Sequence, residues 1–359
     1  IVPLLLIGMG FSPALSIAAV LLFNGLFAVS GAVGVPVTAG LAGPLDLDAD
    51  TVRRVYAVAG IGVAVASVAV MGFVRRQVRT ETGELPPRVA WLMLAGIMVT
   101  YAVLAPWLRE LTGLVAAGGL ALGCFVFLFE RQRMPWRPWL PYGLLVVLLF
   151  LPRVLPSLSE LINVELALRN VLGSGIDTTL KPLRSPLVPF IAAAGLALLL
   201  AKRWRVDLRP VVSKSTTVLI VLFPSLAITQ LMLHSGGDGP SMVDRVAGVV
   251  AASGQAFPLL SPLLGTLGTF MTGSTTVSNV IFGPVQQEAA QNLGLETGTV
   301  LGVQLAGASL GNAVCLFNII AAAAVVGTDN YNAILRRTVV PVVVGALLVA
   351  VVGYVALAI

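Results

Sequence analysis

The chain has 359 residues, of which 57% are hydrophobic and only 11% are charged. An ordinary soluble domain carries about 25% charged residues, so this composition excludes a water-soluble globular protein and indicates a fold that sits in lipid. The net charge is +6, but the basic residues lie in short loops between apolar runs, which argues against nucleic-acid binding and is typical of membrane proteins.

The first predicted element covers residues 1–54. It opens at Ile1 inside an apolar run, without Met or basic residues before it, and we therefore read the start as a truncation rather than a signal peptide. Ile1–Leu45 carries no charge and is too long for one crossing of a hydrocarbon core about 30 Å thick. We expect an N-terminal-half scaffold segment with a broken or re-entrant helix.

Simple membrane spans follow, recognised as uncharged stretches long enough to cross the bilayer. In the predicted helical region 55–154 they are Val55–Val74, Val89–Trp107, Leu111–Phe129 and Pro138–Pro152. Residues 155–184 are expected to form an external loop. The next helical region, 185–239, contains the stretches Ser185–Ala201 and Ser215–Gly237, and Thr338–Ile359 forms the last span.

The distribution of charge predicts the orientation of the spans. Alternating them puts 14 of the 22 Lys and Arg residues on one side with only 5 of the 16 Asp and Glu residues. Because cytoplasmic loops carry the excess of basic residues, we expect this side to be cytoplasmic in a cell membrane. Its loops are Arg75–Arg88, Glu130–Arg137, Lys202–Lys214 and Asp329–Arg337.

Residues 240–359 form the predicted C-terminal-half transport segment. Val246–Gln287 has 42 residues without a charge, and a helix of that length would measure about 63 Å. Its middle is rich in Gly, Ser, Thr and Asn, so we expect a re-entrant hairpin. Thr297–Thr328 is also long and uncharged and is consistent with a broken helix. The fold class predicted is an all-α polytopic helical bundle with inverted repeats and re-entrant or broken helices.

The interrupted segments supply the candidate substrate-binding residues. The N-terminus of a half-helix attracts anions through free N–H groups, hydroxyls add donors, and an amide both donates and accepts. The alternative is that the small residues only allow helices to pack closely. The candidates are Asn24, Ser30 and Gly31 from the first half, and Thr272, Gly273, Ser274, Thr275, Thr276, Ser278, Asn279 and Asn312 from the second.

Motifs along the chain resemble those of the L-lactate permease family. They include Gly10-Phe11-Ser12-Pro13, Gly31–Pro36, Leu180–Leu183 and, most specifically, Gly268–Ser274 followed by Ser278-Asn279. The resemblance implies an importer of 2-hydroxymonocarboxylates such as lactate or glycolate, with proton coupling and re-entrant hairpins. Members often have an acidic residue at the position of Thr275, and lactate and glycolate carriers have Lys at that of Asn312.

The sequence thus predicts a secondary active transporter rather than an enzyme. The chain has one histidine, no acids within its clear spans and no catalytic or metal-ligand motif, so we expect no cofactor and no metal. His234 is a weak candidate for coupling. The alternative is a sodium-coupled transporter of carboxylates or other organic anions with the same ion-transporter architecture. The oligomeric state stays open, with a homo-oligomer among the alternatives.

Overall fold

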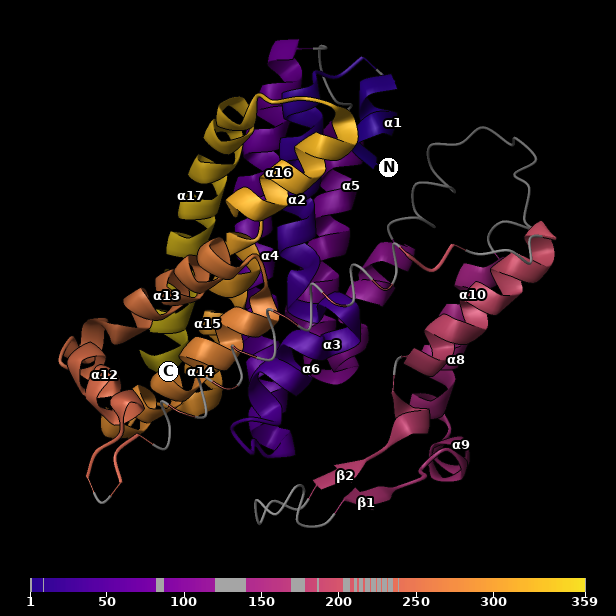
Figure 1. Ribbon diagram of the computed structural model, residues 1–359. Helices are drawn as coiled ribbons and strands as arrows, with labels where there is room; N and C mark the ends of the chain where they lie inside the picture. The colour runs from indigo at the N-terminus through magenta and orange to yellow at the C-terminus, as the bar shows by residue number, and fades with distance from the viewer. Residues whose placement is uncertain are drawn as a thin grey trace. The chain divides into compact units, whose positions relative to one another are not determined.

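The computed structural model (Figure 1) describes residues 2–8, 10–81, 87–119, 140–168, 178–185, 187–202, 207–209 and 239–358, with a few residues between 212 and 237. Nearly all of the regular structure in this part of the chain is helical. Five helical stretches are long and apolar enough to cross a membrane: Pro13–Ala42, Ala49–Glu81, Trp91–Gly119, Thr297–Val326 and Tyr331–Ala358. The protein is a polytopic all-α membrane protein, as its composition predicts.

The chain divides into two compact units, and the smaller one comprises Leu128–Thr216. Helix α8 (Leu140–Val154) packs against α10 (Leu187–Ala201) in this unit. The predicted loop 155–184 contains short elements: α9 (Pro156–Leu161), the antiparallel strands β1 (Leu166–Leu168) and β2 (Thr178–Leu180), and the helical turn η7 (Pro182–Arg184). Apolarity marks membrane crossings well, but it says little about local structure in polar segments.

The larger unit comprises Ile1–Phe127 and Thr217–Ile359. Its N-terminal part contains α1 (Val2–Gly8), α2 (Pro13–Phe27), η1 (Ala28–Ser30), α3 (Gly31–Val37), η2 (Thr38–Ala42), α4 (Ala49–Glu81), α5 (Pro87–Met98), η3 (Val99–Leu104), α6 (Ala105–Leu108) and η4 (Arg109–Leu111). Its C-terminal part contains α12 (Met242–Ala251), η8 (Gly254–Ala256), α13 (Phe257–Thr272), α14 (Thr275–Asn292), α15 (Thr297–Gly311), α16 (Leu316–Val326) and α17 (Tyr331–Ala358).

Helix α4 corrects one predicted boundary. It begins after Asp48, whose carboxylate accepts the N–H groups of Asp50 and Thr51 at 2.9 and 2.8 Å and caps the helix. The bond from the Thr51 N–H is the main reason that the pKa of Asp48 lies below its usual value. The helix then continues to Glu81, so the start of the predicted loop Arg75–Arg88 is wrong.

The predicted boundary of the last long helix is wrong in the same way. Helix α17 begins at Tyr331, inside the predicted loop Asp329–Arg337. In both helices the apolar run ends where the hydrocarbon would end, but backbone hydrogen bonding continues into the polar zone. The predicted spans Leu111–Phe129 and Ser215–Gly237 and the loops Glu130–Arg137 and Lys202–Lys214 lie wholly or partly outside the described residues.

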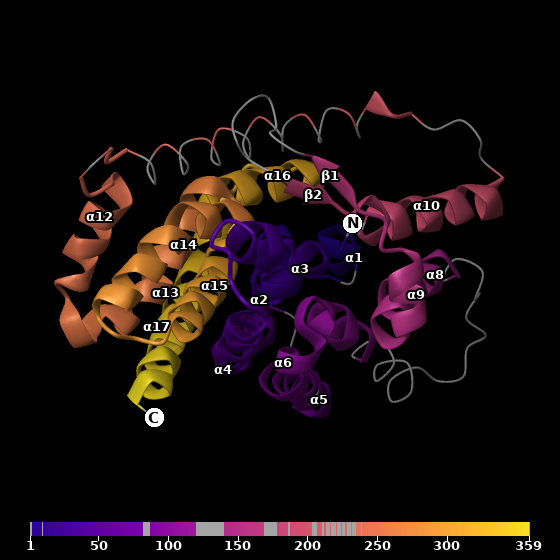
Figure 2. The same ribbon diagram turned by 90° about the horizontal axis from the view of Figure 1, so that it is seen from below.

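The two halves of the larger unit contain a similar sequence of elements, and Figure 2 shows α13, α14 and α15 of the second half beside α2, α3 and α4 of the first. The contacts at the helix ends show that the two halves run in opposite directions. In each half, a broken segment precedes a long helix: α2–α3 precedes α4, and α15–α16 precedes α17. At one end, Glu81 on α4 accepts from Ser12 before α2 and pairs with Arg337 on α17. At the other end, Arg54 on α4 lies beside Glu296 and Thr299 at the start of α15. This antiparallel relation is the one expected for an inverted repeat.

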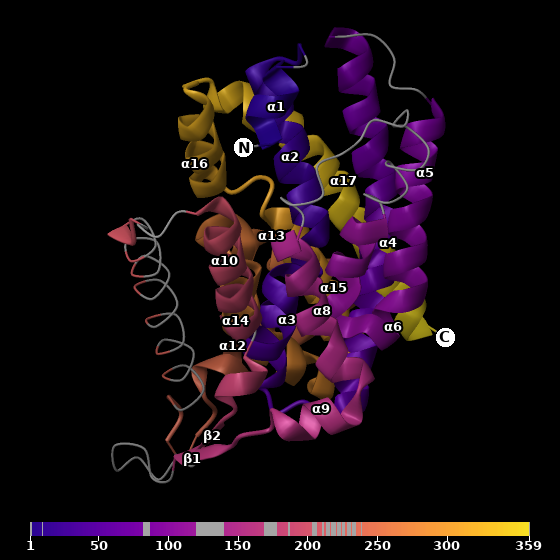
Figure 3. The same cartoon turned by 90° about the vertical axis from the view of Figure 1, so that its right-hand side faces the viewer.

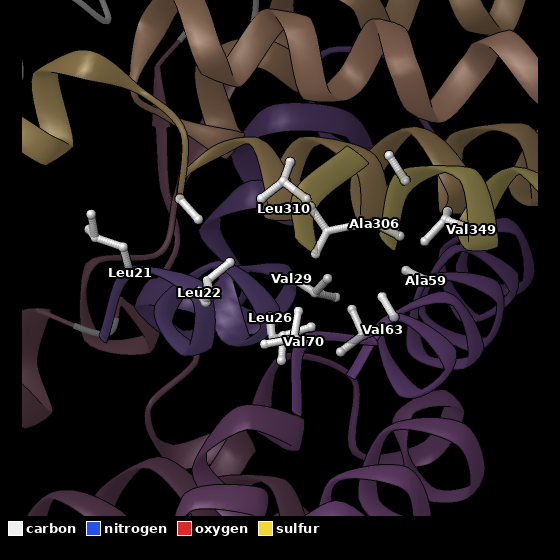
Figure 4. Close-up of a cluster of buried hydrophobic side chains, with 14 of the residues drawn as sticks. Leu21, Leu22, Leu26, Val29, Ala59, Val63, Val70, Ala306, Leu310 and Val349 are labelled. Carbon is white, nitrogen blue, oxygen red and sulfur yellow. The ribbon is translucent and has the colours of Figure 1, made fainter. Parts of the chain in front are cut away.

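A buried apolar core holds α2, α4, α15 and α17 together. Leu22 and Leu26 of α2, Val63 of α4, Leu310 of α15 and Val349 of α17 contribute to it and are almost fully excluded from solvent (Figure 4). Helix α16 follows the break after α15 and contacts α2. Figure 3 shows these two helices close together. This scaffold fixes the ends of the broken segments, and therefore the position of the site.

Gly307 shows how closely α13 and α15 cross. A Cβ atom at this position would collide with the backbone carbonyl of Pro262, while Thr266 donates to the carbonyl of Gly307 at 2.9 Å. We expect Gly307→Ala to lower the free energy of unfolding by about 1–3 kcal/mol, measured by thermal unfolding in detergent. Gly72→Ala is the matched control, because the space around Gly72 on α4 is open. Equal stability of the two variants would contradict the close crossing.

Candidate substrate site

The predicted re-entrant hairpin turns at Gly273. Helix α13 ends there with Gly273 in the left-handed conformation, at φ 71°, and the Ser274 side chain accepts from the Val277 N–H at 3.3 Å to cap α14. The Thr272 hydroxyl donates to the Gly268 carbonyl at 2.8 Å and accepts from the Ser274 N–H at 3.3 Å. Thr272, Gly273 and Ser274 therefore shape the turn that joins α13 to α14.

A second break lies against this hairpin tip. Helix α15 ends at Gly311 and α16 starts at Leu316, with Asn312–Cys315 between them. The Asn312 side-chain amide donates to the Thr275 hydroxyl at 2.7 Å, and Asn318 donates to the Asn312 carbonyl at 3.2 Å. Thr275 and Asn312 are 4% and 8% exposed, so they form a buried, uncharged polar pair. The structure thus brings two predicted site residues into direct contact.

The first half of the chain supplies a third break. In α3, Ala32, Val33 and Gly34 have φ angles of 47°, 59° and 83°. Left-handed backbone is uncommon for alanine and a clear outlier for valine, and such strain tends to persist where the surrounding structure enforces it. After this turn the Pro36 carbonyl accepts from the Asn279 side-chain amide at 2.9 Å. The two halves of the protein therefore meet at Asn279.

Asn279 has a buried acceptor atom that no group in the described part of the chain uses. Its side chain is 0% exposed, its Nδ2 donates to Pro36, and its Oδ1 has no hydrogen-bond partner. Because Pro36 offers only a carbonyl, the amide cannot be turned over without losing this bond. Buried polar atoms are nearly always paired, so Asn279 Oδ1 fits a donor on a ligand, such as a hydroxyl.

The other predicted residues have different surroundings. The Ser278 hydroxyl donates to the Gly265 carbonyl at 2.9 Å and so holds α14 to α13. Ser30 is buried and shares a hydrogen bond of 3.0 Å with the Tyr101 hydroxyl. Thr276 is half-buried, with its carbonyl beside Gly40, and no atom lies within 4 Å of a Cβ built on Gly31.

Asn24 is not brought to this polar cluster. Its side chain is exposed, and it lines a cavity of about 540 Å³ whose other walls are apolar apart from Ser16. His234 lies outside the described residues. Cys315 is buried with a free thiol and lies beside Gly273, whereas Cys124 is outside the described part. No three potential metal-ligating side chains cluster within the described ranges.

Sequence reasoning missed a buried amide network beside the hairpin. Gln286 Nε2 donates to Gln304 Oε1 at 2.8 Å and to the Ser261 carbonyl at 3.1 Å. Gln304 in turn reaches the Ser278 hydroxyl at 3.5 Å. These side chains join α13, α14 and α15 behind the site. The available signal was two uncharged amides inside apolar runs, but their mutual contact depends on the helix crossing.

Comparison with known proteins decides the family. A model of the L-lactate permease family matches residues 132–359. The chain belongs to the L-lactate permease family. It is 26% identical to a putative L-lactate permease of Haemophilus influenzae, over 96% of this chain and 73% of that protein. It is 25% identical to an L-lactate permease of Halalkalibacterium halodurans, over 93% of this chain and 69% of that protein.

Another relative is named for a different substrate. The glycolate permease GlcA of Escherichia coli is 32% identical over 31% of this chain and 20% of its own length. No solved structure matches. The family membership makes the chain a permease-family membrane protein. Thr275 and Asn312, the two positions at which the resemblance led us to expect other residues, are hydrogen-bonded to each other.

Proposed function

We propose that this L-lactate permease family member is a secondary active transporter that imports a small 2-hydroxymonocarboxylate, such as lactate or glycolate, together with protons. The observation that carries the proposal is the convergence of three helix breaks on α14, with the buried Oδ1 of Asn279 unpaired beside them. Breaks of this kind in both halves of a transporter are where substrates bind.

The substrate's two functional groups match two features of α14. The N–H groups at the start of a helix have no acceptors within it, so those of Thr275 and Thr276 suit a carboxylate. One turn further along, Asn279 Oδ1 suits the 2-hydroxyl, because that group donates. A carboxylate alone would leave Asn279 Oδ1 unpaired, which favours a hydroxy acid over a simple fatty acid.

The neutrality of the described site supports coupling to a cation. Thr275, Asn279 and Asn312 carry no charge, so a bound anion would enter without a compensating positive group. An uncompensated charge in a buried site is costly, and a proton carried with the substrate offsets it. Sodium is the alternative, since side-chain and backbone oxygens at helix breaks also suit Na⁺. The basic ends of α4 and α17 support placing those ends in the cytoplasm.

Counterflow in proteoliposomes tests the proposal. Vesicles loaded with unlabelled L-lactate should take up external radiolabelled L-lactate, and an inward proton gradient should increase the uptake. Propionate, which lacks the 2-hydroxyl, should compete about tenfold less well than lactate, since one unmade buried hydrogen bond costs about 1–3 kcal/mol. Absence of uptake for lactate and glycolate would refute the substrate class, and strict dependence on Na⁺ would refute proton coupling.

A further inference from the structure

The helical stretch Trp91–Gly119 turns back on itself at Arg109. Arg109 has φ 48° and ψ −118°, a pair of backbone angles far from those of any regular helix. A Cβ atom on Gly113 would lie 3.3 Å from the Tyr101 hydroxyl, whereas a straight helix would separate the two residues by about 18 Å. The chain therefore forms a helical hairpin, and Arg109 and Glu110 lie at its tip.

The tip packs against the left-handed turn of α3. The Cα and Cβ atoms of Glu110 lie so close to Gly34 that a Cβ atom on Gly34 would collide with the Glu110 side chain. The same Cβ atom would lie 2.8 Å from the Tyr56 hydroxyl of α4. The Oε2 atom of Glu110 is shielded from solvent. Only glycine allows both the positive φ and this contact, so the carboxyl and the turn are held together.

Glu110 differs from the other acids of the candidate spans. In the described part of the chain, the remaining acids of the five spans are Asp50 and Glu81, at the two ends of α4. Glu110 lies instead at the tip of a hairpin, where packing shields its carboxyl from solvent, and a shielded ionisable group in a membrane protein is costly and is a functional candidate. The Tyr56 hydroxyl of α4 lies with Glu110 beside Gly34, and Arg109 precedes Glu110 in the chain. The packed elements α3, η1 and α6 carry no ionisable side chain.

A short piece of backbone connects Glu110 to the substrate site. Gly34, which touches Glu110, is two residues before Pro36, whose carbonyl holds the Asn279 side chain. A change in the charge of the carboxyl acts on the strained turn at Ala32–Gly34 and through it on the bond to Asn279. Packed α helices and turns shift between discrete arrangements rather than deform continuously, so this contact can link two binding events.

We propose that Glu110 is the proton-binding group that couples proton movement to substrate movement, an inference that rests on the proposed function. The carboxylate binds one proton from the external side and becomes a neutral acid, which the apolar α3 tolerates. The substrate anion then occupies the site beside Asn279. After reorientation the acid releases the proton to the cytoplasm, so that one proton and one monocarboxylate anion cross together without net charge.

The test compares exchange with gradient-driven accumulation in proteoliposomes that contain a pH-sensitive dye. With a pH difference of about one unit, the unaltered protein should accumulate lactate about tenfold, the ratio that one proton per anion allows. Glu110→Gln should exchange lactate at a rate independent of pH, should not accumulate it, and should not move protons when lactate is added. Glu110→Asp keeps the carboxyl and should retain accumulation. Glu288→Gln, a half-buried acid on α14 away from the break, is the matched control.

The outcomes separate the inference from the function on which it rests. Accumulation by Glu110→Gln, or loss of accumulation by Glu110→Asp in a well-folded protein, would overturn the role of Glu110 and leave the proposed function standing. Loss of exchange as well as accumulation in a monodisperse Glu110→Gln protein would also overturn it, because the residue would then serve binding. Absence of lactate exchange in the unaltered protein would refute the proposed function itself, and the inference with it.

Discussion

Replacing Asn279 by alanine should lower transport of lactate by about a hundredfold while the protein still reaches the membrane in normal amounts. The change removes the bond to Pro36 that joins the two halves, and it leaves the Pro36 carbonyl buried without a donor. An unpaired buried group costs about 1–3 kcal/mol, which is up to about a hundredfold in binding. The substrate hydroxyl loses its acceptor as well.

Initial rates of counterflow over a range of lactate concentrations would measure this effect. Asn292→Ala is the matched control, because Asn292 is an exposed asparagine at the end of the same helix. Asn279→Asp should not rescue transport, since a carboxylate repels both the Pro36 carbonyl and an anionic substrate. Wild-type transport by the alanine variant would show that Asn279 only packs α14 against α3.

The second large effect is expected when the neutral Thr275–Asn312 pair is exchanged for charges. Asn312→Lys alone should destabilise the protein by about 3–5 kcal/mol, because it places an unpaired cation among buried groups. Thr275→Glu alone should also destabilise it, although an acid suits the start of α14 and a cation suits the end of α15. The double variant should recover much of the loss, since the two positions are in hydrogen-bond contact.

A double-mutant cycle of thermal unfolding in detergent measures this coupling, for which about 0.5–3 kcal/mol is typical of contacting residues. Asn292→Lys is the control, because that side chain is exposed at the end of α14. The same variants should be assayed for lactate counterflow, since a fixed cation at Asn312 would change the requirement for a coupled proton. Strictly additive effects would mean that the two side chains do not act as a pair.

The sequence alone located the interrupted segments because their signals are local. Forty-two residues without a charge cannot be one membrane helix, and Gly273 followed by Ser274 is a typical end of one helix and start of the next. The hairpin α13–α14, the break after Gly311 and the turn in α3 all lie inside the segments that this reasoning selected. Helix ends were predicted less well, because α4 and α17 continue past the apolar run.

The partners of the candidate residues could not be predicted in the same way. Ser278 and Asn279 are neighbours in sequence, but one helix turn sends Ser278 to the Gly265 carbonyl and Asn279 to Pro36. Asn24 and Ser30 stand in one apolar segment, yet Asn24 is exposed and Ser30 is bonded to Tyr101. Glu110 lies between the predicted spans Val89–Trp107 and Leu111–Phe129, and nothing near it in sequence indicates that it touches Gly34.

The sequence by itself determined that the protein lies in a membrane, which family it resembles and where its helices break, because hydrophobicity, charge and turn chemistry are properties of consecutive residues. Only the tertiary structure decided that Asn279 keeps a buried acceptor free, that Thr275 and Asn312 pair, and that Glu110 presses on the turn before Pro36. These facts depend on contacts between residues 37 to 243 positions apart in sequence, which arise from the crossing and packing of whole helices.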